Sequence, residues 1–349
     1  MIGYYVHHHG SGHTRRATAV ARRLTRPVVG LGSGGRPEGW PGEWVDLASD
    51  DVPPVPDSAL ADVTAGDTLH WVPRHHPGLQ ARHRQLVDWI GDTSPDLMVV
   101  DVSVEVTLQA RLCGIPVVVA AMPGERTDRS HIIAYDLAEA LLAPWPAGAH
   151  PDGGWPSHWW DKVWHVGGIS ALDPHPVEPS ANLDDAPAST TPEVRRVLVL
   201  WGGGGGDLPA AALEEARRAT PGWTWEVRGG GHPASPDLWA DLLAADVVVC
   251  HAGQGSVADV ALARRPAVVL AQPRPYDEQA ATARALGRMG LAATGLGWPA
   301  AHEWVGLLSR ALTLGGDGWA VWGGDGAARA ADLLERLAER VGPTGRERR

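Results

Sequence analysis

Short apolar runs of strand length alternate with segments of helical periodicity along most of the chain. In the first half, strand-like runs fall at Ile2–Val6, Val28–Leu31, Glu43–Leu47, residues 95–101, Pro116–Ala121, Leu141–Trp145 and Lys162–Val166. Helical spacing of apolar residues falls between them, at Thr14–Leu24, Leu79–Ile90 and Glu105–Cys113. Strands that alternate with helices are typical of a parallel sheet covered on both faces. The pattern predicts a doubly wound α/β domain over residues 1–171.

The second half repeats this alternation. Strands are predicted at Arg196–Trp201, Thr224–Arg228, Val247–Cys250 and Pro266–Ala271, and helices at Val257–Arg264, Ala280–Met289, Ala301–Leu314 and Gly326–Val341, with a connection over Gly290–Pro299. Residues 172–193 are rich in Pro, Asp, Ser, Ala and Thr and have no periodicity, which predicts an interdomain linker. We therefore expect a second α/β domain over residues 194–341 and a disordered, basic tail over residues 342–349.

Composition narrows the class of protein. A content of 44% hydrophobic and 20% charged residues is typical of a globular chain, and the net charge of −11 argues against nucleic acid as a partner. No apolar run approaches the length of a membrane span, and the N-terminus lacks the basic region of a signal peptide. Cys113 and Cys250 lie in or next to apolar segments, so we expect buried free thiols. These features predict a cytoplasmic protein with no transmembrane segment.

The most informative stretch follows the predicted strand Val247–Cys250. The strand breaks into a turn with two glycines and is followed by a helix, for which Ser256 is the expected N-cap. The free N–H groups of a helix start suit a phosphate or diphosphate. Asp259 is expected in the first helical turn, where a carboxylate could accept hydrogen bonds from a ribose diol. An ordinary strand–turn–helix unit with a glycine-rich turn is the alternative interpretation.

This stretch resembles the donor-binding segment of GT-B glycosyltransferases, in particular the family of the peptidoglycan GlcNAc transferase (family 28, C-terminal domain), and UDP-glycosyltransferase-like proteins. The resemblance implies two Rossmann-like domains that face a central cleft. It implies that Asp259 binds ribose. It also implies that the loop Asp277-Glu278-Gln279, which is rich in hydrogen-bond acceptors, contacts the donor sugar. The turn resembles the H-x-G-x-G phosphate motif of related transferases, so the donor residues expected here are His251, Gly253, Gln254, Gly255 and Ser256.

Two other glycine runs belong to the predicted donor side. Gly202–Gly206 follows a strand and precedes Asp207, a candidate helix N-cap, but it lacks the Gly-Lys-Ser/Thr of a nucleoside-triphosphate loop. Consecutive glycines cost backbone entropy, which the close approach of a ligand would offset. The resemblance implies phosphate contacts for Gly202, Gly203, Gly204 and Gly205. The second run, Gly229–Gly231, follows the predicted strand Thr224–Arg228, and the resemblance puts Gly230 near the nucleotide base.

The first strand is followed by Gly10-Ser11-Gly12-His13. This turn is a poor dinucleotide fingerprint, because Arg15 stands where a third glycine would be needed. It resembles instead the G-x-G-H segment of the glycosyltransferases and the G-H-x-x-R of a related nucleotide-sugar hydrolase. Ligands bind beyond the carboxyl ends of parallel strands, so His13 and Asp101 are expected to face one crevice. The resemblance implies that His13 is the catalytic base and that Asp101 supports it, whereas a helix N-cap is the alternative for Asp101.

A metal site is not predicted. His7 and His9 would share a strand face and His13 could approach from the turn, but no further ligands at zinc-site spacing appear nearby in the sequence. We interpret the histidine run as polar residues at the mouth of a cleft.

The resemblance therefore implies a metal-independent glycosyltransferase without a cofactor. Its co-substrate would be a nucleoside-diphosphate sugar, with a UDP-sugar expected, and its acceptor an unidentified hydroxyl on a small-molecule or lipid-linked acceptor. Inversion at the anomeric carbon is what the family implies. A nucleotide-sugar hydrolase with the same donor domain and a non-catalytic nucleotide-binding module are the alternatives.

Overall fold

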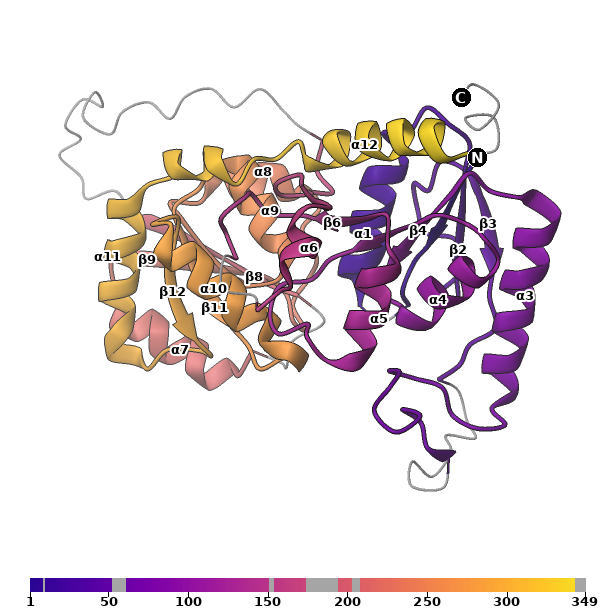
Figure 1. Ribbon diagram of the computed structural model, residues 1–349. Helices are drawn as coiled ribbons and strands as arrows, with labels where there is room; N and C mark the ends of the chain where they lie inside the picture. The colour runs from indigo at the N-terminus through magenta and orange to yellow at the C-terminus, as the bar shows by residue number, and fades with distance from the viewer. Residues whose placement is uncertain (9, 52–60, 151–153, 174–193, 203–207, 343–349) are drawn as a thin grey trace. The chain divides into compact units, whose positions relative to one another are not determined.

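The computed structural model describes residues 1–8, 10–51, 61–150, 154–173, 194–202 and 208–342 (Figure 1). The chain forms two compact units, each with one parallel sheet. The first unit comprises Met1–Pro144, Asp152–Val166 and Gly326–Arg349, and the second comprises Trp145–Pro151 and Gly167–Asp325. No helix among these described residues is long and apolar enough to cross a bilayer.

The first unit contains a seven-stranded sheet in the order β3-β2-β1-β4-β5-β6-β7. Its strands are β1 (Ile2–Tyr5), β2 (Val28–Gly32), β3 (Glu43–Asp46), β4 (Leu97–Asp101), β5 (Val117–Ala120), β6 (Ala140–Ala143) and β7 (Val163–His165). All neighbouring pairs are parallel. Its helices are α1 (Ser11–Ala21), α3 (Pro77–Thr93), α4 (Val104–Leu112), α5 (Arg129–Leu137), α6 (Ser157–Trp160) and α12 (Gly326–Val341). The central strands β1, β4 and β5 are buried along their length, which explains their continuous apolar runs.

The second unit contains a five-stranded parallel sheet in the order β12-β11-β10-β8-β9. Its strands are β8 (Arg195–Trp201), β9 (Trp223–Gly229), β10 (Val247–His251), β11 (Ala267–Ala271) and β12 (Ala293–Leu296). Its helices are α7 (Ala210–Ala219), α8 (Leu238–Ala244), α9 (Gln254–Ala263), α10 (Glu278–Arg288) and α11 (Trp304–Leu314), and three 3₁₀ turns lie at Pro275–Asp277, Ala301–Glu303 and Asp317–Val321. The strand β12 lies inside the segment that was predicted to be a connection. The sequence did not predict this strand because it has only four residues, one of them glycine, and so shows too little periodicity.

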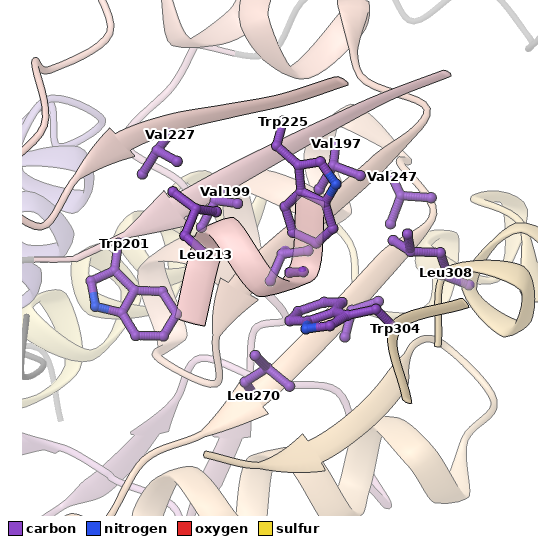
Figure 2. Close-up of a cluster of buried hydrophobic side chains, with 14 of the residues drawn as sticks. Val197, Val199, Trp201, Leu213, Trp225, Val227, Val247, Leu270, Trp304 and Leu308 are labelled. Atoms are coloured by element: carbon purple, nitrogen blue, oxygen red, sulfur yellow. The ribbon is translucent and has the colours of Figure 1, made fainter. Parts of the chain in front are cut away.

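A tryptophan-rich core fills the second unit (Figure 2). Trp225 and Trp304 meet edge to face, with ring centroids 4.9 Å apart and an interplanar angle of 90°. Trp304 is fully buried, and Val197 and Val199 pack in the same cluster from β8. Large rings in this edge-to-face arrangement fill the volume that the absent phenylalanines would otherwise occupy.

The last helix belongs to the first unit, which differs from the predicted assignment of residues 326–341 to the second domain. One face of α12 is buried, and its outer residue Glu335 accepts a hydrogen bond from the Thr25 hydroxyl at 2.7 Å. Glu339 also lies 3.3 Å from the guanidinium of Arg26. The helix packs on α1, its neighbour across this face. Its apolar stripe specifies burial against a partner surface but not which surface.

Two further expectations need correction or fall outside the structure. Cys250 is buried as expected, but Cys113 is exposed, because it caps the C-terminus of α4 at the surface. Most of the predicted linker 172–193, the helix-cap candidate Asp207 and the tail beyond Gly342 lie outside the described residues.

Candidate active site

The first cluster of candidate residues lies at the carboxyl edge of the first sheet. Strands β1 and β4 are adjacent, with Tyr5 opposite Val100, so the segments that follow them emerge side by side. Gly10, at φ +89°, precedes α1, which begins at Ser11, so His13 lies in the first helical turn and not before the helix as predicted. Its Nδ1 lies 3.0 Å from Oδ2 of Asp101, the last residue of β4. The structure therefore brings these two predicted residues together.

Asp101 is not a helix cap. The hydroxyl of Ser103 caps α4 by accepting a hydrogen bond from the backbone N–H of Val106. Val102, between the two, has φ +60°, a strained conformation for a β-branched residue that costs about 1–3 kcal/mol. Asp101, which precedes this strained residue, is fully buried, and its carboxylate contacts His13.

Arg16, the arginine of the G-H-x-x-R pattern, completes this cluster, although the sequence assigned it no role. Its guanidinium forms an ion pair with Oδ1 of Asp101 and lies 3.3 Å from Nδ1 of His13, although only 7% of the residue is exposed. The signal available in the sequence was this pattern, which puts Arg16 three residues after His13 on one helix face. Burial raises the pKa of Asp101, but the combined effect of Arg16 and His13 lowers it by more. The pKa of Asp101 therefore falls below the ordinary range. Asp101 is therefore ionised at neutral pH.

The partners of His13 define its chemistry. Nδ1 lies 3.0 Å from the ionised Asp101 carboxylate and 3.3 Å from Nη2 of Arg16, and we assign its proton to the shorter contact, with the carboxylate. Nε2 is then the unprotonated nitrogen of the neutral ring. The ring of His7 packs edge-on at a centroid distance of 5.4 Å. This arrangement provides an oriented imidazole that can accept a proton at Nε2.

The second cluster lies where β10 meets α9 in the second unit. Gly253, not Ser256, occupies the N-cap position, and its cap has no side-chain hydrogen bond. Val257 donates to the carbonyl of Gly253, so the helix start leaves the N–H groups of Gly255 and Ser256 without intrahelical partners. A Cβ built on Gly253 or Gly255 would meet only open space. The absent side chains thus leave room for an anion beside the N–H groups of Gly255 and Ser256.

His251 borders this helix start. It is 4% exposed, and its ring centroid lies 3.8 Å from that of Trp201. Its Nε2 is buried and makes no hydrogen bond to any described residue. Burial and the charge of Arg274 lower the pKa of His251 to about 4, so the ring is neutral at pH 7. A neutral imidazole can serve an anion here only as an N–H donor.

Asp259 is the sixth residue of α9, so it lies in the second turn and not in the first as expected. It is 4% exposed, and its Oδ1 accepts a hydrogen bond of 2.6 Å from the hydroxyl of Ser170. One carboxylate oxygen is therefore already engaged by the protein. Burial, together with the Asp259 charge, raises the pKa of Cys250 to about 12, which leaves that thiol protonated.

The predicted sugar loop forms a tight turn before α10. Tyr276 and Asp277 have φ of +59° and +56°, and Asp277 is exposed. The amide oxygen of Gln279 accepts a hydrogen bond from the backbone N–H of Gln272 at 3.0 Å, which closes the loop. Glu278 begins α10 and is half-buried. Asp277 is thus the most accessible of the three, and Gln279 has a structural role in this state.

The glycine runs divide into two cases. Gly202 borders open space, whereas Gly203, Gly204 and Gly205 lie outside the described residues. Gly230 has φ +60°, and a Cβ there would lie 2.5 Å from Cδ1 of Trp201. Packing against Trp201 therefore explains this glycine without a ligand.

Comparison with known proteins agrees with this architecture. Residues 233–296 match the Glycosyltransferase family 28 C-terminal domain, a range that contains the whole segment from His251 to Gln279. No curated protein sequence matches the chain. The GT-B glycosyltransferase fold is therefore the class that the two parallel-sheet units and the matched segment define.

Three solved structures illustrate the likeness, which covers nearly the whole chain. The glycotransferase of kitacinnamycin has 18% identity and a TM-score of 0.64, with 97% of this chain and 98% of that chain covered. MurG of Acinetobacter baumannii has 17% identity and a TM-score of 0.63, covering 96% and 99%. VinC, a glycosyltransferase solved in complex with dTDP, has 14% identity and a TM-score of 0.61, covering 97% and 99%. These likenesses confirm the predicted fold class.

Proposed function

We propose that the protein transfers a sugar from a pyrimidine-nucleoside-diphosphate sugar to an acceptor hydroxyl. The observation that carries the proposal is the start of α9, where the N–H groups of Gly255 and Ser256 have no intrahelical partner and Gly253 and Gly255 border open space, inside the segment that matches the family 28 domain. A helix N-terminus of this kind favours a diphosphate. The dTDP in VinC supports the same ligand class, and UDP is our expected nucleotide.

The helix start would also promote departure of the leaving group. As the bond between the anomeric carbon and the diphosphate breaks, negative charge accumulates on the departing oxygen. Preorganised N–H donors and the positive end of the helix dipole stabilise such charge without a metal ion. We therefore propose that donor activation is metal-independent.

His13 would act as the base toward the acceptor. Its Nε2 accepts the proton of the acceptor hydroxyl while that oxygen bonds to the anomeric carbon, and attack from the face opposite the diphosphate inverts the configuration. The ionised Asp101 at 3.0 Å stabilises the imidazolium that forms, and Arg16 holds the Asp101 carboxylate in place. A positioned general base contributes roughly 10²–10⁴-fold to such a step.

The test combines nucleotide binding with product analysis. UDP and dTDP should bind in calorimetry, and incubation of a UDP- or dTDP-sugar with a panel of hydroxylated acceptors should yield a glycoside. The matched control omits the acceptor, because a hydrolase would then release free sugar rapidly and stoichiometrically. A chain that binds neither UDP nor dTDP would disprove the donor site, and one that turns over only with water would disprove transfer.

A further inference from the structure

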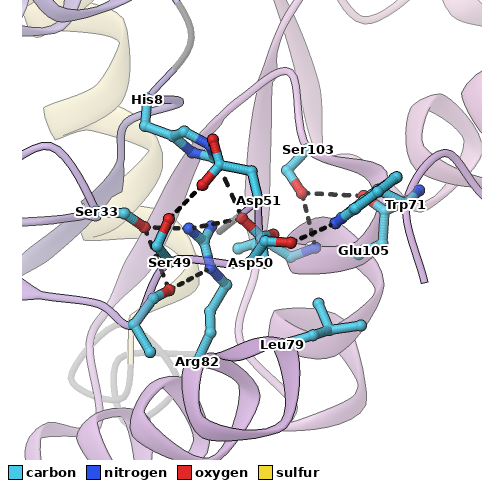
Figure 3. Close-up of polar contacts among 12 residues, drawn as sticks. His8, Ser33, Ser49, Asp50, Asp51, Trp71, Leu79, Arg82, Ser103 and Glu105 are labelled. Carbon is cyan, nitrogen blue, oxygen red and sulfur yellow. Dashed lines mark hydrogen bonds and ion pairs between the residues drawn. The ribbon is translucent and has the colours of Figure 1, made fainter. Parts of the chain in front are cut away.

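The structure brings to His8 the carboxylates that the sequence around the histidine run lacks. The Nε2 of His8 lies 3.2 Å from Oδ2 of Asp51 and 3.8 Å from Oδ1 of Asp50 (Figure 3). His8 follows β1, and the two aspartates follow β3 in the same sheet. One imidazole and two carboxylates, some 40 residues away in sequence, thus converge within 4.8 Å of one another.

We propose that His8, Asp50 and Asp51 bind one first-row divalent cation, Mn²⁺ or Zn²⁺. Metal–ligand bonds of about 2.0–2.2 Å put neighbouring ligand atoms about 3.0–3.5 Å apart in octahedral or tetrahedral sites. The distances from Nε2 of His8 to the two carboxylate oxygens, 3.2 and 3.8 Å, lie close to that range. A set of one nitrogen and two oxygen atoms suits cations that accept both imidazole and carboxylate, such as Mn²⁺ and Zn²⁺.

The surrounding protein holds both carboxylates. Arg82, which is almost fully buried, lies with its guanidinium 3.2 Å from Oδ1 of Asp50 and donates from Nε to the carbonyl of Ala48 at 3.1 Å. The indole of Trp71 donates to the backbone carbonyl of Asp50 at 2.9 Å, and the hydroxyl of Ser49 donates to Oδ1 of Asp51. Partners of this kind orient metal ligands in known sites.

Charge favours this cluster over the other candidate in the described residues. With His8 neutral, two carboxylates and Arg82 leave the cluster one net negative charge. The buried Oδ1 of Asp50 pairs with Arg82 at 3.2 Å without the geometry of a hydrogen bond, so this oxygen can still bind a cation.

The second group, His70, Asp128 and His131, is less suited to a cation. Its one carboxylate is offset by Arg126, whose Nη1 lies 3.3 Å from Nε2 of His131. That contact makes Nε2 the acceptor, so the proton sits on the nitrogen that faces Asp128 and blocks it as a ligand. This group therefore provides a matched control.

A cation bound by His8, Asp50 and Asp51 would link the segment after β1 to the segment after β3. This link would lie close to His13, the proposed base. The ring of His7 lies 5.1 Å from that of His8 and 5.4 Å from that of His13. Three protein ligands leave coordination positions for water or for an oxygen of the acceptor. The site is independent of the donor diphosphate, whose proposed residues belong to the second unit.

The experiment titrates the metal-stripped full chain with Mn²⁺, followed by electron paramagnetic resonance, and with Zn²⁺, followed by calorimetry. We expect one site per chain, with affinity reduced more than about 10-fold in His8→Gln and in Asp51→Asn. Asp51 is exposed, so Asp51→Asn should fold normally in circular dichroism. Asp128→Asn is the control and should bind as the wild type does.

Two results would overturn the proposal. One is the absence of one-to-one binding of either metal, which would leave the cluster as an ion pair of protonated His8. The other is binding that Asp128→Asn weakens and Asp51→Asn does not. UDP affinity, measured on the same His8→Gln variant, should be unchanged, so failure of the metal site and failure of the donor site remain distinguishable.

Discussion

The buried pair of Asp101 and Arg16 gives the sharpest test of how the candidate base is held. Asp101 is fully buried, Arg16 is 7% exposed, and their side chains form an ion pair. Replacing Asp101 with Asn would remove the charge that this ion pair provides to the buried guanidinium of Arg16. Removing one partner of such a pair costs about 3–5 kcal/mol, whereas replacing both with neutral groups of similar volume is often close to neutral.

We therefore expect Asp101→Asn to lower the free energy of unfolding by about 3–5 kcal/mol, and Arg16→Met to lower it comparably. The double variant should recover most of the loss, with a coupling energy of at least about 2 kcal/mol, because the two side chains are in contact. Urea titration gives the free energies, and hydrogen exchange of the β1 and β4 amides assigns the loss to the first unit. Strictly additive effects, or a loss below about 1 kcal/mol in Asp101→Asn, would refute the reasoning.

The same pair predicts how stability depends on pH. The pKa of Asp101 is depressed in the folded protein and close to the ordinary value of about 3.9 in the unfolded chain. Between these two values the unfolded chain binds a proton that the folded protein does not, so stability rises with pH. The contribution should be complete above about pH 5 and should fall as the pH decreases through 4 and below. Asp101→Asn should flatten this part of the stability profile, and an unchanged acid limb would contradict the assignment.

Four further outcomes follow from the described contacts. His13→Ala should lower kcat by about 10²-fold or more with UDP affinity unchanged, because the donor residues belong to the other unit; a near-normal kcat in the folded variant would exclude His13 as base. Asp259→Ala should weaken UDP binding by about 1–3 kcal/mol in calorimetry if its second oxygen binds ribose, and unchanged affinity would remove it from the site. Excess EDTA should leave UDP affinity unaltered, since helix N–H groups hold the diphosphate in our proposal. UDP binding that requires Mg²⁺ or Mn²⁺ would contradict this metal-independent donor site. Trp304→Ala should cost about 3–5 kcal/mol in urea unfolding, while Val305→Ala on the exposed side of the same helix should cost under about 0.5 kcal/mol, and equal losses would contradict the described core.

Much of the architecture could be read from local pattern, because burial on both faces leaves continuous apolar runs. Strands β1, β4, β5, β8, β10 and β11 appear in the sequence as such runs, and the strand–turn–helix units at Gly10 and Gly253 are marked by their glycines. The convergence of His13 and Asp101 was predictable too. Both follow parallel strands, and the carboxyl ends of parallel strands meet at one edge of the sheet.

The remaining features depend on neighbours that local sequence does not specify. Arg16 reads as one more charged residue of α1, and only the packing of β4 beside β1 turns it into the counter-ion of Asp101. Asp50 and Asp51 follow β3, which is separated from β1 by β2 in the sheet order β3-β2-β1. The tertiary structure therefore decides that their carboxylates lie near His8. Similarly, the apolar stripe of α12 fits any complementary surface, and the tertiary structure decided that this surface is α1. Periodicity reports whether a residue is buried, whereas its partner is chosen by sheet order and by the competition of all surfaces for the same stripe.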